Sequence, residues 1–120
     1  MARSFRELVV WQRASELAVE VYRSTRSWPR EELYGLTSQV RRAVISVTSN
    51  IAEGEGRKSP KEFCHFLRTA MGSLREVESQ LFVAKELGFL DDAALHAFDE
   101  LCSEVGRMLN GLLSKVSARV

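Results

Sequence analysis

The sequence contains few of the residues that interrupt helices. Only two prolines, Pro29 and Pro60, and seven glycines occur among its 120 residues. Proline removes a helical hydrogen bond and glycine lowers helix stability, so the long stretches between them favour helices. No repeat or low-complexity segment is present, and this length fits a single domain spanning residues 1–120.

Cysteine and long apolar runs are also scarce. The two cysteines, Cys64 and Cys102, lie inside helical patterns without a secretory context, so we expect reduced thiols. The run Leu8-Val9-Val10-Trp11 is far shorter than the apolar core of a signal peptide. No stretch approaches the roughly 20 apolar residues that a membrane span needs. We therefore expect a cytoplasmic protein that does not enter a membrane.

The chain has little net charge, at +1, which by itself neither favours nor excludes nucleic acid. The charge is unevenly distributed, however. Residues 1–30 hold six Arg against three Glu, a net of +3, and residues 91–120 hold three basic against five acidic groups, a net of −2. We favour ion pairing between the first and last helices, with a role in assembly as the alternative.

Apolar residues recur at steps of three and four in four segments, which predict helices over residues 5–26, 36–54, 60–87 and 92–116. Trp28-Pro29 ends the first helix, and Gly54-Glu55-Gly56 ends the second by tolerating positive φ. The third begins with a capping box from Ser59 to Glu62, and Asp91 caps the fourth. The short connectors predict an all-α, antiparallel up-down-up-down four-helix bundle. Its core stripe in the first helix is predicted as Leu8, Trp11, Ser15, Ala18 and Tyr22.

No motif indicates an enzyme. A di-iron bundle needs two Glu-x-x-His motifs, and the sequence has one, from Glu62 to His65. Cys64 and His65 are adjacent and so point to different faces of a helix, which excludes a nucleophile–base pair. No phosphate-binding glycine loop occurs. We therefore expect no catalysis, no metal and no cofactor.

A polar stripe accompanies the apolar stripes of the second and third helices. The stripe contains small and amide side chains, which form helices poorly and are not expected on a solvent-exposed face. They indicate that this face contacts another helix. Two interpretations stay open: a contact between subunits and a polar layer inside the bundle. The candidate residues are Asn50, Glu53, Ser73, Glu76 and Gln80.

Cations gather around the connector between the second and third helices. Arg57 and Lys58 precede a helix N-terminus, and Lys61 lies in its first turn, where free amides and the helix dipole favour anions. Arg41 and Arg42 extend this basic surface. The alternative, which we favour on this motif alone, is a solvated loop. Any nucleic-acid binding would not depend on sequence, because no aromatic cluster for base stacking is evident.

Several segments together resemble a known family. These are Leu36-Thr37-Ser38-Gln39-Val40-Arg41-Arg42-Ala43, Ser49-Asn50-Ile51-Ala52-Glu53-Gly54 and Gly72-Ser73-Leu74-Arg75-Glu76. They resemble the four helix bundle protein family, whose founding members are encoded in intervening sequences of bacterial 23S ribosomal RNA genes. The likeness extends to about Leu90. It implies an antiparallel four-helix subunit and a ring-like homopentamer.

A related branch of that family, the accessory variability determinant of diversity-generating retroelements, implies a basic surface and nucleic-acid binding. The matching polar positions are expected in helix or subunit contacts, with the arginines also available to phosphate: Arg41, Arg42, Asn50, Glu53, Arg57 and Glu76. This chain departs from the family in having Thr48 where proline is common, and from the retroelement branch in its near-neutral charge.

The sequence thus predicts a non-catalytic homo-oligomer, a pentamer, that binds RNA or DNA backbone without sequence preference. The alternative is a structural or adaptor protein whose partner is another polypeptide and which binds no nucleic acid.

Overall fold

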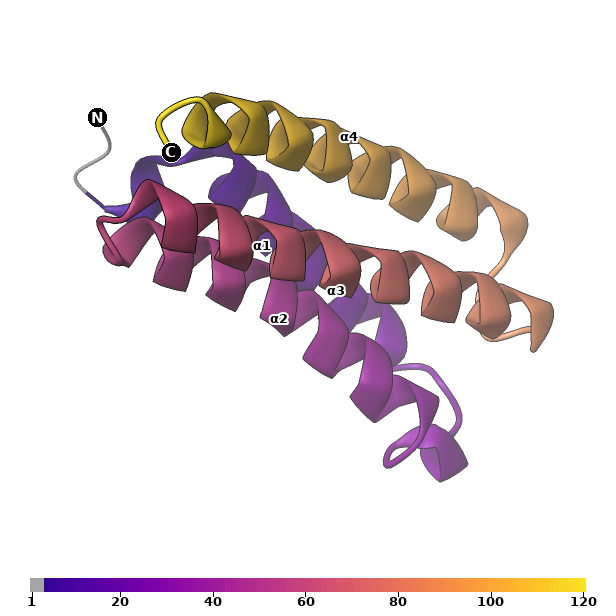
Figure 1. Cartoon of the computed structure of the whole chain (residues 1–120). Helices are drawn as coiled ribbons and strands as arrows, with labels where there is room; N and C mark the ends of the chain where they lie inside the picture. Colours follow the sequence, from indigo (N-terminus) through magenta and orange to yellow (C-terminus); the bar gives the residue numbers. More distant parts are fainter. Residues whose placement is uncertain (1–3) are drawn as a thin grey trace.

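The computed structural model describes residues 4–120, which form four long helices and two short 3₁₀ turns. The helices are α1 (Val9–Thr25), α2 (Leu36–Gly56), α3 (Pro60–Glu86) and α4 (Asp92–Ser117); η1 (Phe5–Glu7) precedes α1 and η2 (Arg30–Glu32) precedes α2. Residues 4–120 contain no strand. Each helix runs back along the one before it (Figure 1), so the predicted all-α, up-down-up-down bundle is confirmed. None of the helices in the described chain is long and apolar enough to cross a membrane.

Local capping chemistry sets several of the helix ends as predicted. The Ser59 hydroxyl accepts the N–H of Glu62 at 3.3 Å and begins α3, with Pro60 in the first turn. Asp91 Oδ1 accepts the N–H of Ala94 at 2.8 Å and begins α4. Gly88 follows the end of α3 in the left-handed region, at φ 84°.

The first helix begins later than predicted, at Val9 instead of Phe5. The Ser4 hydroxyl accepts the N–H of Arg6 at 3.1 Å and starts η1, and Leu8 then adopts an extended conformation with ψ 123°. Because an extended residue cannot continue a helix, α1 starts only after Leu8.

The glycines of Gly54-Glu55-Gly56 do not end α2, which corrects the second predicted boundary. The helix continues through Gly56, and the residue with positive φ is Lys58, at 59°. Gly54 instead allows α2 to approach α3 closely, because a Cβ at that position would lie 2.7 Å from the Cβ of Phe66.

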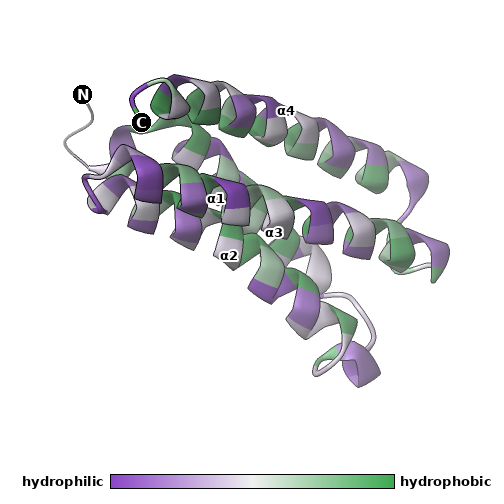
Figure 2. Cartoon of the chain, viewed as in Figure 1, coloured by the Kyte–Doolittle hydropathy of each residue, from purple (hydrophilic) through white to green (hydrophobic). Residues whose placement is uncertain are grey.

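The buried stripe of α1 is also not the one predicted. Its core side chains are Val10, Ala14, Leu17, Ala18, Val21 and Thr25. Of the predicted stripe, Ala18 is buried, but Tyr22 is 37% exposed. Apolar residues occupy two adjacent stripes of this helix, and periodicity cannot choose between them. In α2, α3 and α4 the buried residues recur mostly at the predicted steps of three and four. Figure 2 shows hydrophobic residues on the helix sides that face one another.

Candidate nucleic-acid interface

A groove between α1 and α2 is lined by arginines. It consists of three adjoining hollows of about 410, 410 and 230 Å³, which share lining residues with one another. None of the residues that line them is acidic. The arginines of this α1–α2 groove are Arg23, Arg26, Arg30, Arg41 and Arg42.

Arg41 is held in place by its neighbours on α1. Its Nε donates to the Thr25 hydroxyl at 2.8 Å, and Thr25 itself donates to the carbonyl of Val21 at 2.8 Å. The guanidinium carbon lies 4.7 Å from the centre of the Tyr22 ring, within cation–π range. These contacts leave most guanidinium N–H groups of Arg41 available, in a fixed orientation, to an anion in the groove.

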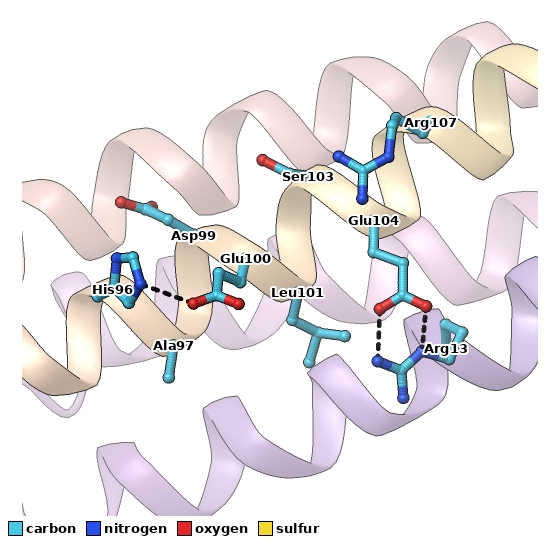
Figure 3. A pocket seen from close by; sticks show the side chains of 9 residues that line it. All are labelled: Arg13, His96, Ala97, Asp99, Glu100, Leu101, Ser103, Glu104 and Arg107. Atoms are coloured by element: carbon cyan, nitrogen blue, oxygen red, sulfur yellow. Dashed lines mark hydrogen bonds and ion pairs between the residues drawn. The ribbon is translucent and has the colours of Figure 1, made fainter.

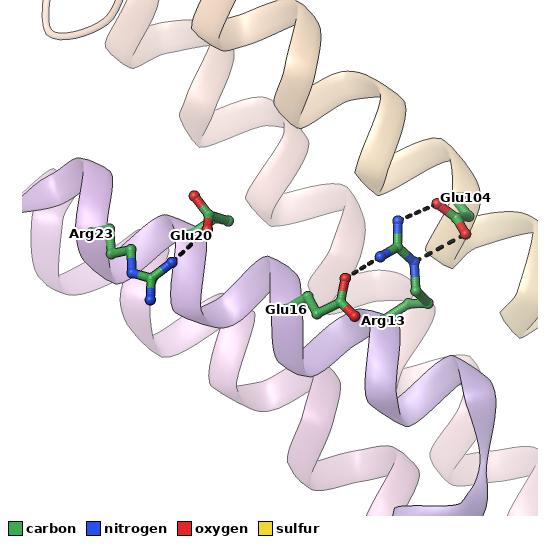
Figure 4. A network of polar contacts seen from close by, with 5 residues as sticks. All are labelled: Arg13, Glu16, Glu20, Arg23 and Glu104. Carbon is green, nitrogen blue, oxygen red and sulfur yellow. Dashed lines mark hydrogen bonds and ion pairs between the residues drawn. The ribbon is translucent and has the colours of Figure 1, made fainter.

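Three other arginines of the groove carry uncompensated charge. Arg26, Arg30 and Arg42 are exposed and form no ion pair with any residue from 4 to 120. Arg23 differs, because its Nη1 lies 3.0 Å from Glu20 Oε1 (Figure 4). Phosphate groups would meet no competing carboxylate from the groove lining itself.

Aromatic side chains accompany these charges. Tyr34 is 93% exposed and lines the groove together with Tyr22. Exposed tyrosine rings and guanidinium groups are the surfaces on which unstacked bases pack. The sequence prediction missed this cluster, because it assigned Tyr22 to the core and found no aromatic group near the arginines.

The predicted cations fall into two separate groups. Arg41 and Arg42 lie in the α1–α2 groove, whereas Arg57, Lys58 and Lys61 lie at the opposite end of α2, about 22 Å away along the helix from Arg42 to Arg57. Arg57 Nη2 donates to Glu53 Oε2 at 2.8 Å. Its guanidinium carbon also lies 5.2 Å from the centre of the Phe66 ring.

Lys58 and Lys61 are exposed and have no ion-pair partner in the described part of the chain. Since Arg57 is already neutralised by Glu53, this connector holds less free positive charge than the α1–α2 groove. The groove is therefore the stronger candidate for an anion-binding surface.

The predicted polar stripe is only partly brought together. Ser46 on α2 and Ser73 on α3 share a hydrogen bond of 2.7 Å between their hydroxyls, and Asn50 Nδ2 donates to Ser46 Oγ at 3.0 Å. This small polar contact joins Asn50 and Ser73 within the bundle. The remaining candidates lie apart from it: Glu53 pairs with Arg57, Glu76 is exposed, and Gln80 is half-buried, with no partner for its Oε1 among residues 4–120.

A second groove, between α1 and α4, has a different charge pattern. It is a hollow of about 740 Å³ whose lining includes three carboxylates, those of Asp99, Glu100 and Glu104 (Figure 3). Arg13 Nη2 and Nε donate to the two oxygens of Glu104 at 2.6 and 3.0 Å, which confirms the predicted pairing of the first and last helices. Its carboxylates make this groove unsuitable for phosphate.

The Arg13–Glu104 contact also affects the pKa of the Glu104 carboxyl. The hydrogen bonds from Arg13 hold the pKa of the Glu104 carboxyl below its ordinary value, and the positive charge of Arg13 acts in the same direction. Arg13 also contacts Glu16 on its own helix (Figure 4), so each nitrogen of this guanidinium has a carboxylate partner.

The environment of Cys102 does not favour a nucleophilic thiol. Burial, together with the nearby charges of Glu78 and Asp99, raises the pKa of the Cys102 thiol to about 12. A thiol of this kind stays protonated at neutral pH and is a poor nucleophile. Within residues 4–120 no group of three or more His, Cys, Asp or Glu side chains could hold a metal ion.

The comparisons with known proteins agree with this fold. Residues 6–111 match the model of the family described as 23S rRNA-intervening sequence protein. A crystal structure of a protein with unknown function from the S23 ribosomal protein family of Bacteroides thetaiotaomicron has the same fold, with a TM-score of 0.82. It shares 20% sequence identity, and the alignment covers 88% of this chain and 96% of that one. No curated protein matches the chain.

Proposed function

The chain belongs to the 23S rRNA-intervening sequence protein family, and we propose that it is a non-catalytic, homo-oligomeric module that binds the backbone of RNA or DNA without sequence preference. The observation that carries this proposal is the α1–α2 groove, in which arginines gather without a single lining carboxylate. On a chain with a net charge of only +1, such a separation of charge makes one face attractive to a polyanion.

The binding would be driven by the release of counterions. If Arg26, Arg30, Arg41 and Arg42 each contact one phosphate of a single strand, the logarithm of the association constant should fall with the logarithm of salt concentration at a slope of roughly −3. The faces of Tyr22 and Tyr34 would add stacking with any base, so affinity should vary little among sequences.

The test is fluorescence anisotropy with a labelled single-stranded RNA of mixed sequence, titrated at several salt concentrations. The double variant Arg30→Ala/Arg42→Ala should weaken binding and reduce the salt slope by roughly 0.7 per lost phosphate contact. A control, Arg68→Ala/Lys115→Ala, removes the same charge from exposed positions on α3 and α4. If the groove variant and the control lose the same affinity for RNA, the binding site lies outside the groove. If the wild-type chain binds no RNA at low salt, the proposal is refuted.

The connector at the other end of α2 is tested separately. Lys58→Ala/Lys61→Ala also removes two positive charges, from exposed side chains that lie outside the α1–α2 groove. We expect this variant to bind as the control does. If this variant loses more affinity for RNA than the groove variant does, the interface lies at the connector instead.

We also propose that the binding unit is a homopentamer, as the family resemblance implies. Near the end of α3, Phe82, Val83 and Leu87 expose 55%, 44% and 57% of their surfaces, although they are large and apolar. Large apolar side chains exposed along one stretch of a helix support a protein contact. Light scattering on the purified chain at micromolar concentration is expected to give five subunits, and a monomer would refute it.

The same apolar residues favour the second candidate function, an adaptor that binds another polypeptide. A monomer that fails to bind RNA at low salt would support the adaptor over the nucleic-acid module.

A further inference from the structure

Large apolar side chains line the α1–α2 groove together with its arginines. Val19 and Tyr22 of α1 and Ile45 of α2 line one of the two larger hollows. Leu33 and Tyr34 line the other, which Tyr22 also borders. All five side chains are between 37% and 93% exposed, and they are half of the ten large hydrophobic residues that are exposed in the described part of the chain. We call these five residues the apolar lining.

The hollow that Ile45 borders has few polar groups free to hold a ligand. The Thr48 hydroxyl, which lines the same hollow, donates to the carbonyl of Ile45 at 2.8 Å. Arg23 is paired with Glu20 (Figure 4). Arg26 is the one arginine of this hollow that forms no ion pair with any residue from 4 to 120. This section of the groove therefore offers an occupant mainly apolar surface beside a single uncompensated cation.

Apolar surface and positive charge together narrow the choice of occupant. No carboxylate lines the groove, so its occupant carries negative charge. Exposed apolar side chains gain free energy only when the occupant also brings apolar faces that cover them. In a duplex the faces of the bases are stacked on one another, so proteins contact mostly phosphates, sugars and shape. A single strand presents phosphates and unstacked base faces side by side.

We propose that the α1–α2 groove selects single-stranded nucleic acid over duplex, with phosphates on the arginines and base faces on the apolar lining. The inference rests on the proposed function and adds to it the strand state of the ligand and the residues that recognise it. Val19, Leu33 and Ile45 make no hydrogen bond to a base edge, so this selection does not depend on base identity.

The first experiment compares one RNA in two states. A labelled strand of mixed sequence without self-complementarity is titrated by fluorescence anisotropy, alone and annealed to its complement, at the same low salt concentration. We expect the single strand to bind about tenfold more tightly, which is the effect of roughly one stacked base. A surface that bound only phosphates would favour the duplex instead, because its charge density is higher.

The second experiment removes part of the apolar lining without changing charge. Val19→Ser/Ile45→Ser should lower the affinity for the single strand about tenfold and leave both the affinity for the duplex and the salt slope unchanged. Retained duplex binding would show that the arginines are still in place. The matched control is Val9→Ser/Val120→Ser, which removes two exposed apolar side chains outside the groove and should bind as the wild type does.

A third variant is expected to gain affinity, so a folding defect cannot imitate its result. Ile45→Tyr places an aromatic ring in the apolar lining, where it can stack on a base. We expect affinity for the single strand to rise severalfold and affinity for the duplex to stay the same. An equal rise for both forms, or no rise, would count against base contacts in this hollow.

The outcomes separate this inference from the proposed function. If the duplex binds as tightly as the single strand, or if Val19→Ser/Ile45→Ser weakens both equally, strand selection is overturned while backbone binding stands. If neither form binds at low salt, the nucleic-acid function itself falls. If Val19→Ser/Ile45→Ser lowers the mass that light scattering gives for the chain, the apolar lining is a contact between subunits, and the inference is likewise overturned.

Discussion

Replacing Gly54 with alanine tests how closely α2 and α3 approach. The new Cβ would lie 2.7 Å from the Cβ of Phe66 and 2.9 Å from Cδ1 of Phe63. The Phe63 ring can rotate, but the Phe66 Cβ is fixed to the α3 backbone, so the helices themselves must separate. Overpacking of this kind costs about 1–3 kcal/mol, and alanine returns about 1 kcal/mol through its higher helix propensity. We therefore expect a net loss of up to about 2 kcal/mol in the free energy of unfolding.

The assay is urea denaturation followed by circular dichroism at one fixed protein concentration, since any oligomer makes stability concentration-dependent. Gly111→Ala in α4 is the matched control, because a Cβ there meets no atom within 4 Å. That variant should gain about 0.5–1 kcal/mol from helix propensity alone. Equal stabilisation by both substitutions would refute the close approach.

Three further predictions follow from the polar groups. Because the folded pKa of Glu104 lies below the ordinary value of 4.5, its ion pair stabilises the fold at neutral pH, and this contribution is lost as pH falls through the folded pKa. The stability difference between wild type and Glu104→Gln should therefore shrink in acid, and urea titrations in which it stays constant would contradict this. With a pKa of about 12, Cys102 should react with a thiol reagent at neutral pH only when the chain unfolds, as peptide mapping by mass spectrometry can show. Asn50→Leu should disturb assembly or folding more than Lys115→Ala, measured by light scattering and thermal melting; equal effects would argue against a role for the polar contact.

The sequence predicted the features that depend on local chemistry. Ser59 and Asp91 cap their helices through backbone groups three residues away, so their role is readable from neighbouring residues. The stripes of α2, α3 and α4 were also predictable, because each of these helices has one dominant apolar face.

The failures concern features that arise only when helices pack. On α1 two apolar stripes compete, and contact with the other helices selects the one containing Leu17 and Val21. Gly54 reads as a helix terminator in the sequence, but its role is set by the α3 backbone opposite it. These are tertiary effects that overrule a local pattern.

The candidate groove likewise combines residues that the sequence identified with an arrangement that only packing produces. The resemblance identified Arg41 and Arg42, but it could not join them to Arg26 and Arg30, which reach the groove through the path of the chain between α1 and α2. The missed exposure of Tyr22 follows directly from the wrong stripe on α1.

The contact between Glu32 and the first turn of α2 limits how basic the adjoining part of the α1–α2 groove can become. Gly35 makes room for that carboxylate, because a Cβ there would lie 2.9 Å from Glu32 Oε1. Glu32→Gln would remove a nearby negative charge and make the corner more attractive to anions, but it would also weaken the bond that fixes where α2 starts. A substitution at Glu32 that raises affinity for anions would therefore loosen the start of α2. An engineered increase in anion affinity would have to be made at another residue.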